Sequence, residues 1–131
     1  MFLLPSLQLC RVHLVLRPLL VSSQYTHYPR PQDSGNHEDV TEVTLTNKEG
    51  KGIRVTAIDR PFSFSALYYT VDDIYKATHD CDLKPRKEII LSLDAAVLGL
   101  GNSSCGPGVL KKYAIDKQKP HTLRVRFSLI K

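Results

Sequence analysis

Apolar and polar residues alternate along several stretches of the chain, and this period of two predicts β-strands. The stretches with this pattern are residues 40–46, 52–58, 62–69 and 122–130. Residues 47–50 separate the first two stretches and have the composition of a tight turn, so a β-hairpin is predicted there. In the third stretch Phe62, Phe64 and Ala66 fall on one face, which is expected to face the core.

Two more features complete the predicted set of strands. In the last stretch Leu123, Val125, Phe127 and Leu129 alternate strictly with the residues between them, so they share one face. Residues 89–93 have the sequence Ile-Ile-Leu-Ser-Leu, which is typical of a buried strand.

One short helix is predicted after the third strand. Thr70 and Asp73 have the spacing of a capping box, and the helix is expected to continue to about Ala77. Five or six strands, this helix and no internal repeat predict an all-β fold, an antiparallel β-sandwich. The other segments are predicted to be an extended segment at 22–28, a polar loop with a glycine turn at 32–39, and one amphipathic turn or a short strand at 109–115.

Residues 1–20 differ from the rest of the chain. They are rich in leucine and valine, but arginines and a histidine interrupt them and Pro5 and Pro18 break them. A secretory signal requires a positive charge before its apolar core, and none is present here. No apolar run is long enough for a membrane span. Both a poor amphipathic helix and a strand fit the pattern. We therefore expect an atypical extension at 1–20, a domain at 21–131, no membrane partner, and a cytoplasmic or periplasmic location.

The most unusual segment is a glycine-rich stretch between two predicted strands, residues 93–108, here called the glycine island. It is rich in glycine, serine, asparagine and proline. Glycine loses the most backbone entropy on folding, and loops of this composition usually bring the backbone close to another group. The island contains no nucleophile beside an obvious base, no paired carboxylates and no metal-ligand spacing. It is expected to form the edge of a site and not its chemical centre.

Composition narrows the classes of function. The 131 residues are enough for one domain with one core. The formal net charge of +5 comes from scattered basic residues, and the densest spots, 84–87 and 111–112, have no aromatic ladder on which bases could stack. Nucleic-acid binding is therefore not expected. The three cysteines lack CxxC spacing, and Cys81, in the polar segment 78–82, is expected in a surface turn and not in a metal site.

The carboxylates that could form a glycosidase pair have other expected roles. Glu38 and Asp39 are adjacent, and neighbours on a strand point to opposite faces, so they are not expected to flank one bond. Asp72 and Asp73 stand at a helix start, where the helix dipole explains them. Asp94 ends a predicted strand and is expected to cap backbone N–H groups of the glycine island, with a substrate contact as the alternative.

A serine or thiol hydrolase would need Ser103, Ser104 or Cys105 beside a histidine. Composition leaves this open, because the chain also contains His27, His37, His79 and His121. The sequence around the island is, however, not the strand–turn–helix elbow of G-x-S-x-G.

Four blocks in order carry a resemblance to a known family. They are PRPQDSGNHEDV at 29–40, PFSFSA at 61–66, LKPRKEIILSLD at 83–94 and GLGNSSCGP at 99–107. Together they resemble the C-terminal domain, also called the small chain or domain 5, of the glycoside hydrolase family 2 β-galactosidases. The resemblance covers about residues 21–127. It implies an antiparallel β-sandwich of the galactose-mutarotase-like type, present here only in part.

The resemblance also implies where the chemistry lies. In that family the catalytic glutamates are on a TIM barrel outside this domain, and a glycine-rich loop of the sandwich reaches the rim of the sugar pocket. Carried over to this chain, the residues at the rim are Gly101, Asn102, Ser103, Ser104 and Cys105. Cys105 stands where many members have a tryptophan. Thr41 and Glu42 replace the usual arginine and aromatic residue.

The leading hypothesis is thus a β-galactosidase C-terminal domain or fragment that walls the sugar site and has no catalysis of its own. Its expected partners are a catalytic TIM-barrel portion and, at low affinity, a β-galactoside. No cofactor is expected in this chain, since the Mg and Na ions of the full-length family bind elsewhere. The alternatives are a carbohydrate-binding module that uses Tyr68, Tyr69 and Tyr75, or a structural piece whose open strand edges favour self-association.

Overall fold

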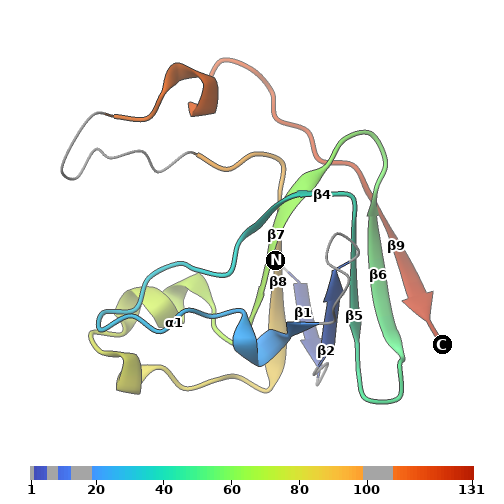
Figure 1. Cartoon of the computed structure of the whole chain (residues 1–131), viewed down its shortest axis with the longest axis vertical. Helices are drawn as coiled ribbons and strands as arrows, with labels where there is room; N and C mark the ends of the chain where they lie inside the picture. Colours follow the sequence, from blue (N-terminus) through green and yellow to red (C-terminus); the bar gives the residue numbers. More distant parts are fainter. Residues whose placement is uncertain (1, 6–8, 13–18, 99–107) are drawn as a thin grey trace.

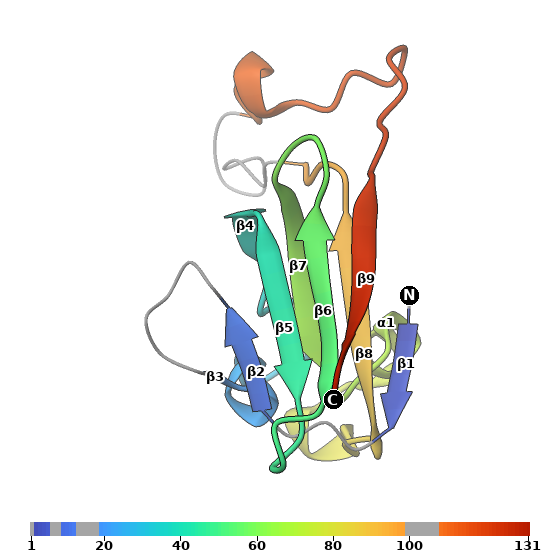
Figure 2. The same ribbon diagram turned by 90° about the vertical axis from the view of Figure 1, so that its right-hand side faces the viewer.

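Two antiparallel sheets face each other and form a β-sandwich (Figures 1 and 2). The computed structural model describes the backbone of residues 2–5, 9–12, 19–98 and 108–131, and the side chains of 19–98 and 108–131. One sheet has the order β1 (Phe2–Pro5), β8 (Glu88–Asp94), β7 (Phe62–Leu67), β4 (His37–Val40). The other has the order β3 (Leu19–Leu20), β2 (Leu9–Val12), β5 (Glu42–Thr46), β6 (Gly52–Ala57), β9 (Val125–Ile130). The predicted all-β sandwich with one short helix is confirmed.

The core lies between the two sheets and is made by the inward faces of their central strands. Phe62, Phe64 and Ala66 of β7 are buried together, as their spacing predicts. The other members of this cluster are Val21, Val40, Val43, Leu45, Val55, Ile89 and Leu91. Alternation along β7 thus places one face in the core, because successive side chains of a strand point to opposite sides.

The hairpin between β5 and β6 is confirmed, and Asn47 organises its turn. The Asn47 carboxamide oxygen accepts hydrogen bonds from the backbone N–H of Glu49 and of Lys51, at 3.1 and 2.9 Å. Gly50 has a φ of 80°, a conformation that glycine adopts without steric cost. Pairing then continues in register from Thr46 with Gly52 to Glu42 with Thr56.

The helix α1 (Val71–Lys76) has the predicted capping box. The Thr70 hydroxyl accepts from the Asp73 N–H at 3.1 Å, and the Asp73 carboxylate accepts from the Thr70 N–H at 2.9 Å. The Asp73 carboxylate also accepts two hydrogen bonds from the Arg86 guanidinium, at 2.6 and 2.8 Å. These guanidinium bonds hold the pKa of the Asp73 carboxyl well below its usual range. Asp73 therefore ties the helix to the segment that leads into β8.

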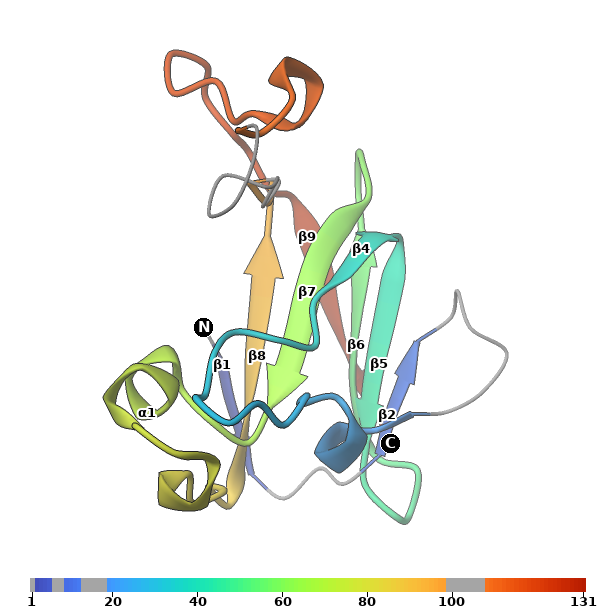
Figure 3. The ribbon, with the colours of Figure 1, turned by 60° about the vertical axis from the view of Figure 1, so that its left-hand side comes forward.

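A second, smaller apolar cluster includes a residue of this helix. Figure 3 shows α1 beside the sandwich. Ile74 of the helix, Leu67 of β7 and Tyr25 are buried in it, and Tyr69 packs against them. Leu67 is on the face of β7 opposite to the main core, so one strand serves both clusters.

Residues 32–46 depart from the prediction. Residues 37–40 form β4 and not the end of a loop, and residues 40–46 do not form one continuous strand. The chain passes at Thr41 from β4 in one sheet to β5 in the other. Asp39 has a φ of 56°, and the pairing of β4 with β7 shifts between His37 and Val40, so the backbone turns away from its first sheet here. A hydrogen bond from the Ala57 N–H to the Thr41 carbonyl, at 2.8 Å, holds the crossing.

Three other segments complete the comparison with the predicted elements. Residues 21–23 form a 3₁₀ turn and not an extended segment. Residues 111–113 also form a 3₁₀ turn, which agrees with the turn alternative for 109–115. Residues 2–5 and 9–12 are strands, which agrees with the strand alternative for these parts of the N-terminal segment. The two strands belong to different sheets (Figure 2). The division of the chain at residue 20 stays a prediction.

The apolar face of the last predicted strand, which contains β9, is only partly buried. Leu123 and Val125 pack against the core, but Phe127 is 45% and Leu129 is 81% exposed. β9 lies at the edge of its sheet. No helix within the described residues is long and apolar enough to cross a membrane.

Gly52 begins β6 where there is no room for a side chain. A Cβ atom at this position would lie 1.9 Å from the Leu45 carbonyl oxygen. Gly52→Ala is therefore expected to lower the free energy of unfolding by about 3 kcal/mol or more, since backbone must move. Gly108→Ala is the control, because a Cβ there meets nothing within 4 Å. Urea denaturation of both variants measures the difference, and equal midpoints would contradict the expectation.

The contacts of Asp73 predict a second stability difference. Asp73→Asn is expected to lower the free energy of unfolding by about 1–2 kcal/mol, because the charge-assisted bonds to Arg86 are lost and the cap is weakened. Asp72→Asn is the matched control, since it removes a carboxylate from the same helical turn. Its effect should stay near about 0.5 kcal/mol. Thermal and urea unfolding of the two variants measure this difference. An equal loss of unfolding free energy in both variants would mean that the helix dipole alone explains the effect.

Candidate functional site

The candidate site is the end of the sandwich from which the glycine island extends. The predicted rim residues Gly101, Asn102, Ser103, Ser104 and Cys105 lie outside the described residues, so their role stays a prediction. Both flanks of the island are described, and they leave the sandwich at the same end, above β4 and β7 in Figure 1. The surroundings of the island can therefore be built from its flanks.

A cavity of about 280 Å³ lies at this end of the sandwich. Three parts of the chain meet there: Glu38 and Asp39 of β4, the start of β7, and both flanks of the island. Its lining is completed by Pro61, Phe62, Ser63, Ala95, Ala96, Val97, Lys112, Tyr113, Ala114, Ile115 and His121. The cavity is thus bounded partly by strands of the sandwich and partly by the segments that flank the island.

Glu38 and Asp39 both line this cavity, although adjacent residues on a regular strand point to opposite faces. The alternation on which the expectation of opposite faces rests is not regular in β4. The φ of Asp39 is 56° and the pairing of β4 with β7 shifts between His37 and Val40, so the regular alternation is interrupted where both residues line the cavity. Both are exposed, and neither carboxylate has a partner within the described part of the chain. Two carboxylates in this position can accept hydrogen bonds from hydroxyl groups or attract a cation.

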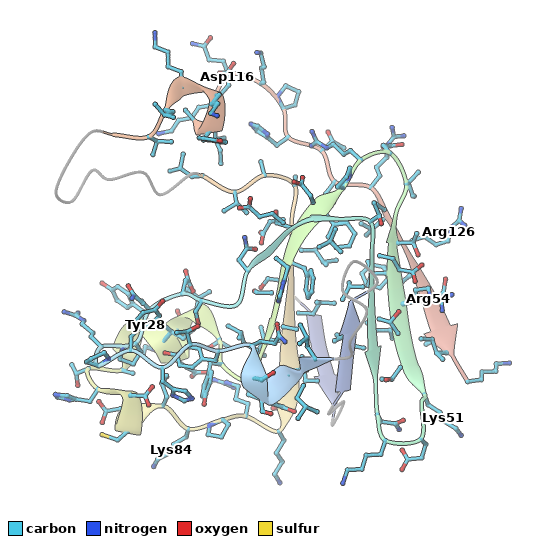
Figure 4. All side chains as sticks on the ribbon, in the orientation of Figure 1. Tyr28, Lys51, Arg54, Lys84, Asp116 and Arg126 are labelled. Carbon is cyan, nitrogen blue, oxygen red and sulfur yellow. The ribbon has the colours of Figure 1, made fainter. Side chains whose placement is uncertain are left out.

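The segment after the island is held by its own contacts. The His121 Nε2 lies 3.1 Å from the Asp116 carbonyl oxygen, to which it donates when it carries the proton. The Lys112 ammonium lies 4.4 Å from the centre of the Tyr113 ring, a cation–π contact. Asp116 also pairs with Lys119, at 3.3 Å. Figure 4 shows Asp116 above the sandwich, in the segment that follows the island.

The structure separates the histidines that could have served a hydrolase. His27 pairs with Asp80 at 2.9 Å, and His79 lies 3.7 Å from Asp82, both beside α1. His37 donates to the Gln24 carboxamide oxygen at 2.5 Å. Of the four predicted candidates, His121 alone lines the cavity beside the island. The sequence did not distinguish it, because its spacing from the island carries no motif.

His37 fixes the strand that carries the two carboxylates. Its ring stacks on Phe64, with centroids 5.0 Å apart and an interplanar angle of 19°, and the two residues are register partners in β4 and β7. Burial lowers the pKa of the His37 imidazole. A charged imidazole at this position would therefore weaken the packing of β4 on β7.

The other predicted candidates lie elsewhere or have structural partners. Tyr68 packs on the main core and Tyr69 on the smaller cluster, while Tyr75 is 84% exposed on α1. The three tyrosines thus do not form one platform for a sugar. Cys81 is exposed in a 3₁₀ turn, and Asp82 beside it accepts from the N–H groups of residues 78 and 79.

Asp94 ends β8 as predicted and is exposed. Its expected bonds to the island fall outside the described residues, so its capping role stays a prediction. No group of three or more histidine, cysteine or acidic side chains within the described residues is placed to hold a metal ion.

Comparison with known proteins gives one consistent family. A family model described as β-galactosidase small chain matches residues 19–129. The β-galactosidase of Staphylococcus xylosus is 34% identical over 89 residues, which are 68% of this chain and 9% of that protein. BgaC of Bifidobacterium adolescentis, also a β-galactosidase, is 34% identical over 78% of this chain and 10% of its own length. The β-galactosidase small subunit of Latilactobacillus sakei is 33% identical over 70% of this chain and 32% of its own length.

The matched region begins at Leu19, the first residue of β3, and residues 1–18 precede it. The chain spans about a tenth of the length of the β-galactosidases that it matches, and about a third of the small subunit.

The lowered pKa of His37 predicts a pH dependence of stability. A base whose pKa is lower in the folded state than in the unfolded state binds more protons when unfolded, so stability is lost as the pH falls below about 6.5. The free energy of unfolding is expected to decrease from pH 8 to pH 5, and His37→Gln should flatten this slope. His79→Gln is the control, because that side chain is 75% exposed. If both variants show the same slope of unfolding free energy against pH, groups other than His37 take up the proton on unfolding.

Proposed function

Because the chain belongs to the β-galactosidase small-chain family, we propose that it forms one wall of the sugar site of a β-galactosidase and has no catalysis of its own. The observation that carries this proposal is the cavity at the island end of the sandwich, lined by Glu38 and Asp39. In the proposal the glycine island, with residues 101–105, reaches the rim of the sugar pocket. The partner is the catalytic portion of the enzyme, which supplies the catalytic groups.

Exposed apolar side chains support docking of this end onto a partner. Val97 and Leu98 precede the island and are 40% and 53% exposed, while Leu110 and Tyr113 follow it and are 62% and 54% exposed. Val97 and Tyr113 also line the cavity, and apolar side chains exposed beside a cavity are typical of an interaction surface. Contact with a catalytic portion would bury them and fix the two flanks of the island.

The carboxylates of the cavity support contact with a sugar and not catalysis. Glu38 and Asp39 are consecutive and open to solvent, and a sugar hydroxyl is a suitable donor to each. A glycosidase would instead need two carboxyl groups on opposite sides of the scissile bond, one of them with a raised pKa. Affinity of the chain alone for a β-galactoside is therefore proposed to be low.

A graft tests this function. Residues 19–129 replace the matching segment of the Staphylococcus xylosus β-galactosidase, and hydrolysis of a chromogenic galactoside is measured for the graft and for a deletion of that segment. The graft should retain turnover that the deletion lacks, while the purified chain alone should show none. Loss of turnover in a folded graft would contradict the proposed wall, and turnover by the chain alone would contradict the absence of catalysis.

Matched variants of the graft locate the docking surface. The double variant Val97→Asp, Leu98→Asp should lower kcat/KM at least about tenfold, a loss of about 1.4 kcal/mol, because two charges would be buried at the contact. Val71→Asp is the control, since Val71 is 64% exposed on α1, away from the island. Equal activities of the two variants would place the contact elsewhere.

We also propose a second role, self-association of the free chain. The specific observation in its favour is the exposed apolar end of β9, at the edge of the five-stranded sheet.

A further inference from the structure

The ring of Tyr113 is the exposed aromatic surface of the cavity at the island end. Two tyrosine or phenylalanine side chains line this cavity within the described residues, Phe62 and Tyr113. Phe62 belongs to the core and is 2% exposed, whereas Tyr113 is 54% exposed. A molecule in the cavity therefore meets an aromatic ring mainly at Tyr113.

Local contacts orient this ring. Tyr113 ends the 3₁₀ turn η3 (Lys111–Tyr113), and its N–H donates to the Leu110 carbonyl at 2.8 Å. The Lys112 ammonium lies 4.4 Å from the centre of the ring and covers one of its faces. Because a cation on one face leaves the opposite face uncovered, that second face is open to an apolar group.

The flank that follows the island is anchored to the sandwich where the chain returns to β9. The Arg60 guanidinium donates to the Thr122 carbonyl at 2.5 Å, and Arg124 pairs with Asp59. Asp59 and Arg60 lie in the turn between β6 and β7, so this turn holds the returning chain. His121 comes directly before the anchored residues and lines the cavity. These contacts keep the flank beside the cavity.

The charged groups of the cavity are available to a ligand. The Glu38 and Asp39 carboxylates accept hydrogen bonds, and the Lys112 ammonium donates them. None of these three groups has a salt-bridge partner within the described part of the chain. The cavity thus offers two acceptor groups and one donor group in addition to the ring.

This set of groups selects the class of ligand. A divalent cation needs more oxygen ligands, and in the part of the chain that the structure describes no three histidine, cysteine or acidic side chains are placed to hold one. An anion would meet two carboxylates against one ammonium group. A neutral ring with several hydroxyl groups and one apolar face matches the acceptors, the donor and the aromatic ring, and a cavity of about 280 Å³ has room for one such ring. A sugar has this chemistry.

We propose that Tyr113 packs the open face of its ring against the C–H face of a galactosyl ring, while Glu38 and Asp39 accept hydrogen bonds from its hydroxyl groups. The inference rests on the proposed function and deepens it, because it names the side chain that selects the sugar.

The selection follows from the shape of the sugar. In a β-galactoside the axial 4-hydroxyl leaves the C–H groups at C3, C4 and C5 on one face of the ring, and such a face packs well on an aromatic side chain. In a β-glucoside the 4-hydroxyl is equatorial and the C4–H group points to the opposite face, so less apolar surface is buried on the aromatic ring. Tyr113 therefore favours the galactoside.

Titration of the chain, followed by NMR, tests this role of Tyr113. Methyl β-D-galactopyranoside should shift backbone amide signals with a dissociation constant in the millimolar range, and methyl β-D-glucopyranoside should bind at least about fivefold more weakly. Tyr113→Ala should raise the dissociation constant of the galactoside at least about fivefold and reduce the preference between the two sugars. Tyr113→Phe should keep both the affinity and the preference, because the aromatic face is retained.

Tyr75→Ala is the matched control, because Tyr75 is 84% exposed on α1 and does not line the cavity. Its dissociation constant should equal that of the unchanged chain. An unchanged value for Tyr113→Ala, an equal loss in both alanine variants, or no binding of the galactoside by the chain would each overturn the proposed role of Tyr113. The graft measures the proposed wall separately, so a graft with turnover would retain the wall even where the role of Tyr113 fails.

Discussion

The burial of Phe62 and Phe64 between the two sheets is the contact on which the rest of the structure depends. Both side chains lie on the inner face of β7 and are 2% and 0% exposed. Burying a phenylalanine contributes about 1.5–3 kcal/mol, and these two sit among aliphatic residues of four other strands. Because β7 also carries Leu67 on its outer face, the same strand supports the smaller cluster that includes a residue of α1. The sandwich and the helix are thus joined through one strand.

The passage of the chain between sheets determines where the candidate site lies. At residues 39–41 the backbone leaves β4 and enters β5, and the left-handed conformation of Asp39 makes this possible. The same irregularity brings Glu38 and Asp39 to one cavity. His37, stacked on Phe64, ties this strand to the core. The site is therefore built from an irregular strand that the core holds in place.

The two proposed roles use opposite ends of one sandwich. At one end, exposed apolar residues flank the glycine island and fit contact with a catalytic portion. At the other end, Leu129 of β9 is 81% exposed. A two-layer fold explains both, because side chains at the ends and edges of a sheet are buried only if another element reaches them. Family membership supports the proposal for the island end of the sandwich. The geometry of the edge strand supports the proposal for the other end.

The sequence alone determined the elements whose causes are local. Alternation predicted β6 and β7, the spacing of Thr70 and Asp73 predicted the capping box, and four ordered blocks identified the family. Tertiary structure decided what local pattern does not contain: that β4 and β5 belong to different sheets, that Glu38 and Asp39 share a cavity, and that His121 alone among the candidate histidines lies there. It also decided that Leu129 is exposed. The physical reason is that alternation shows which residues share a face of a strand, whereas burial depends on what another part of the chain places against that face.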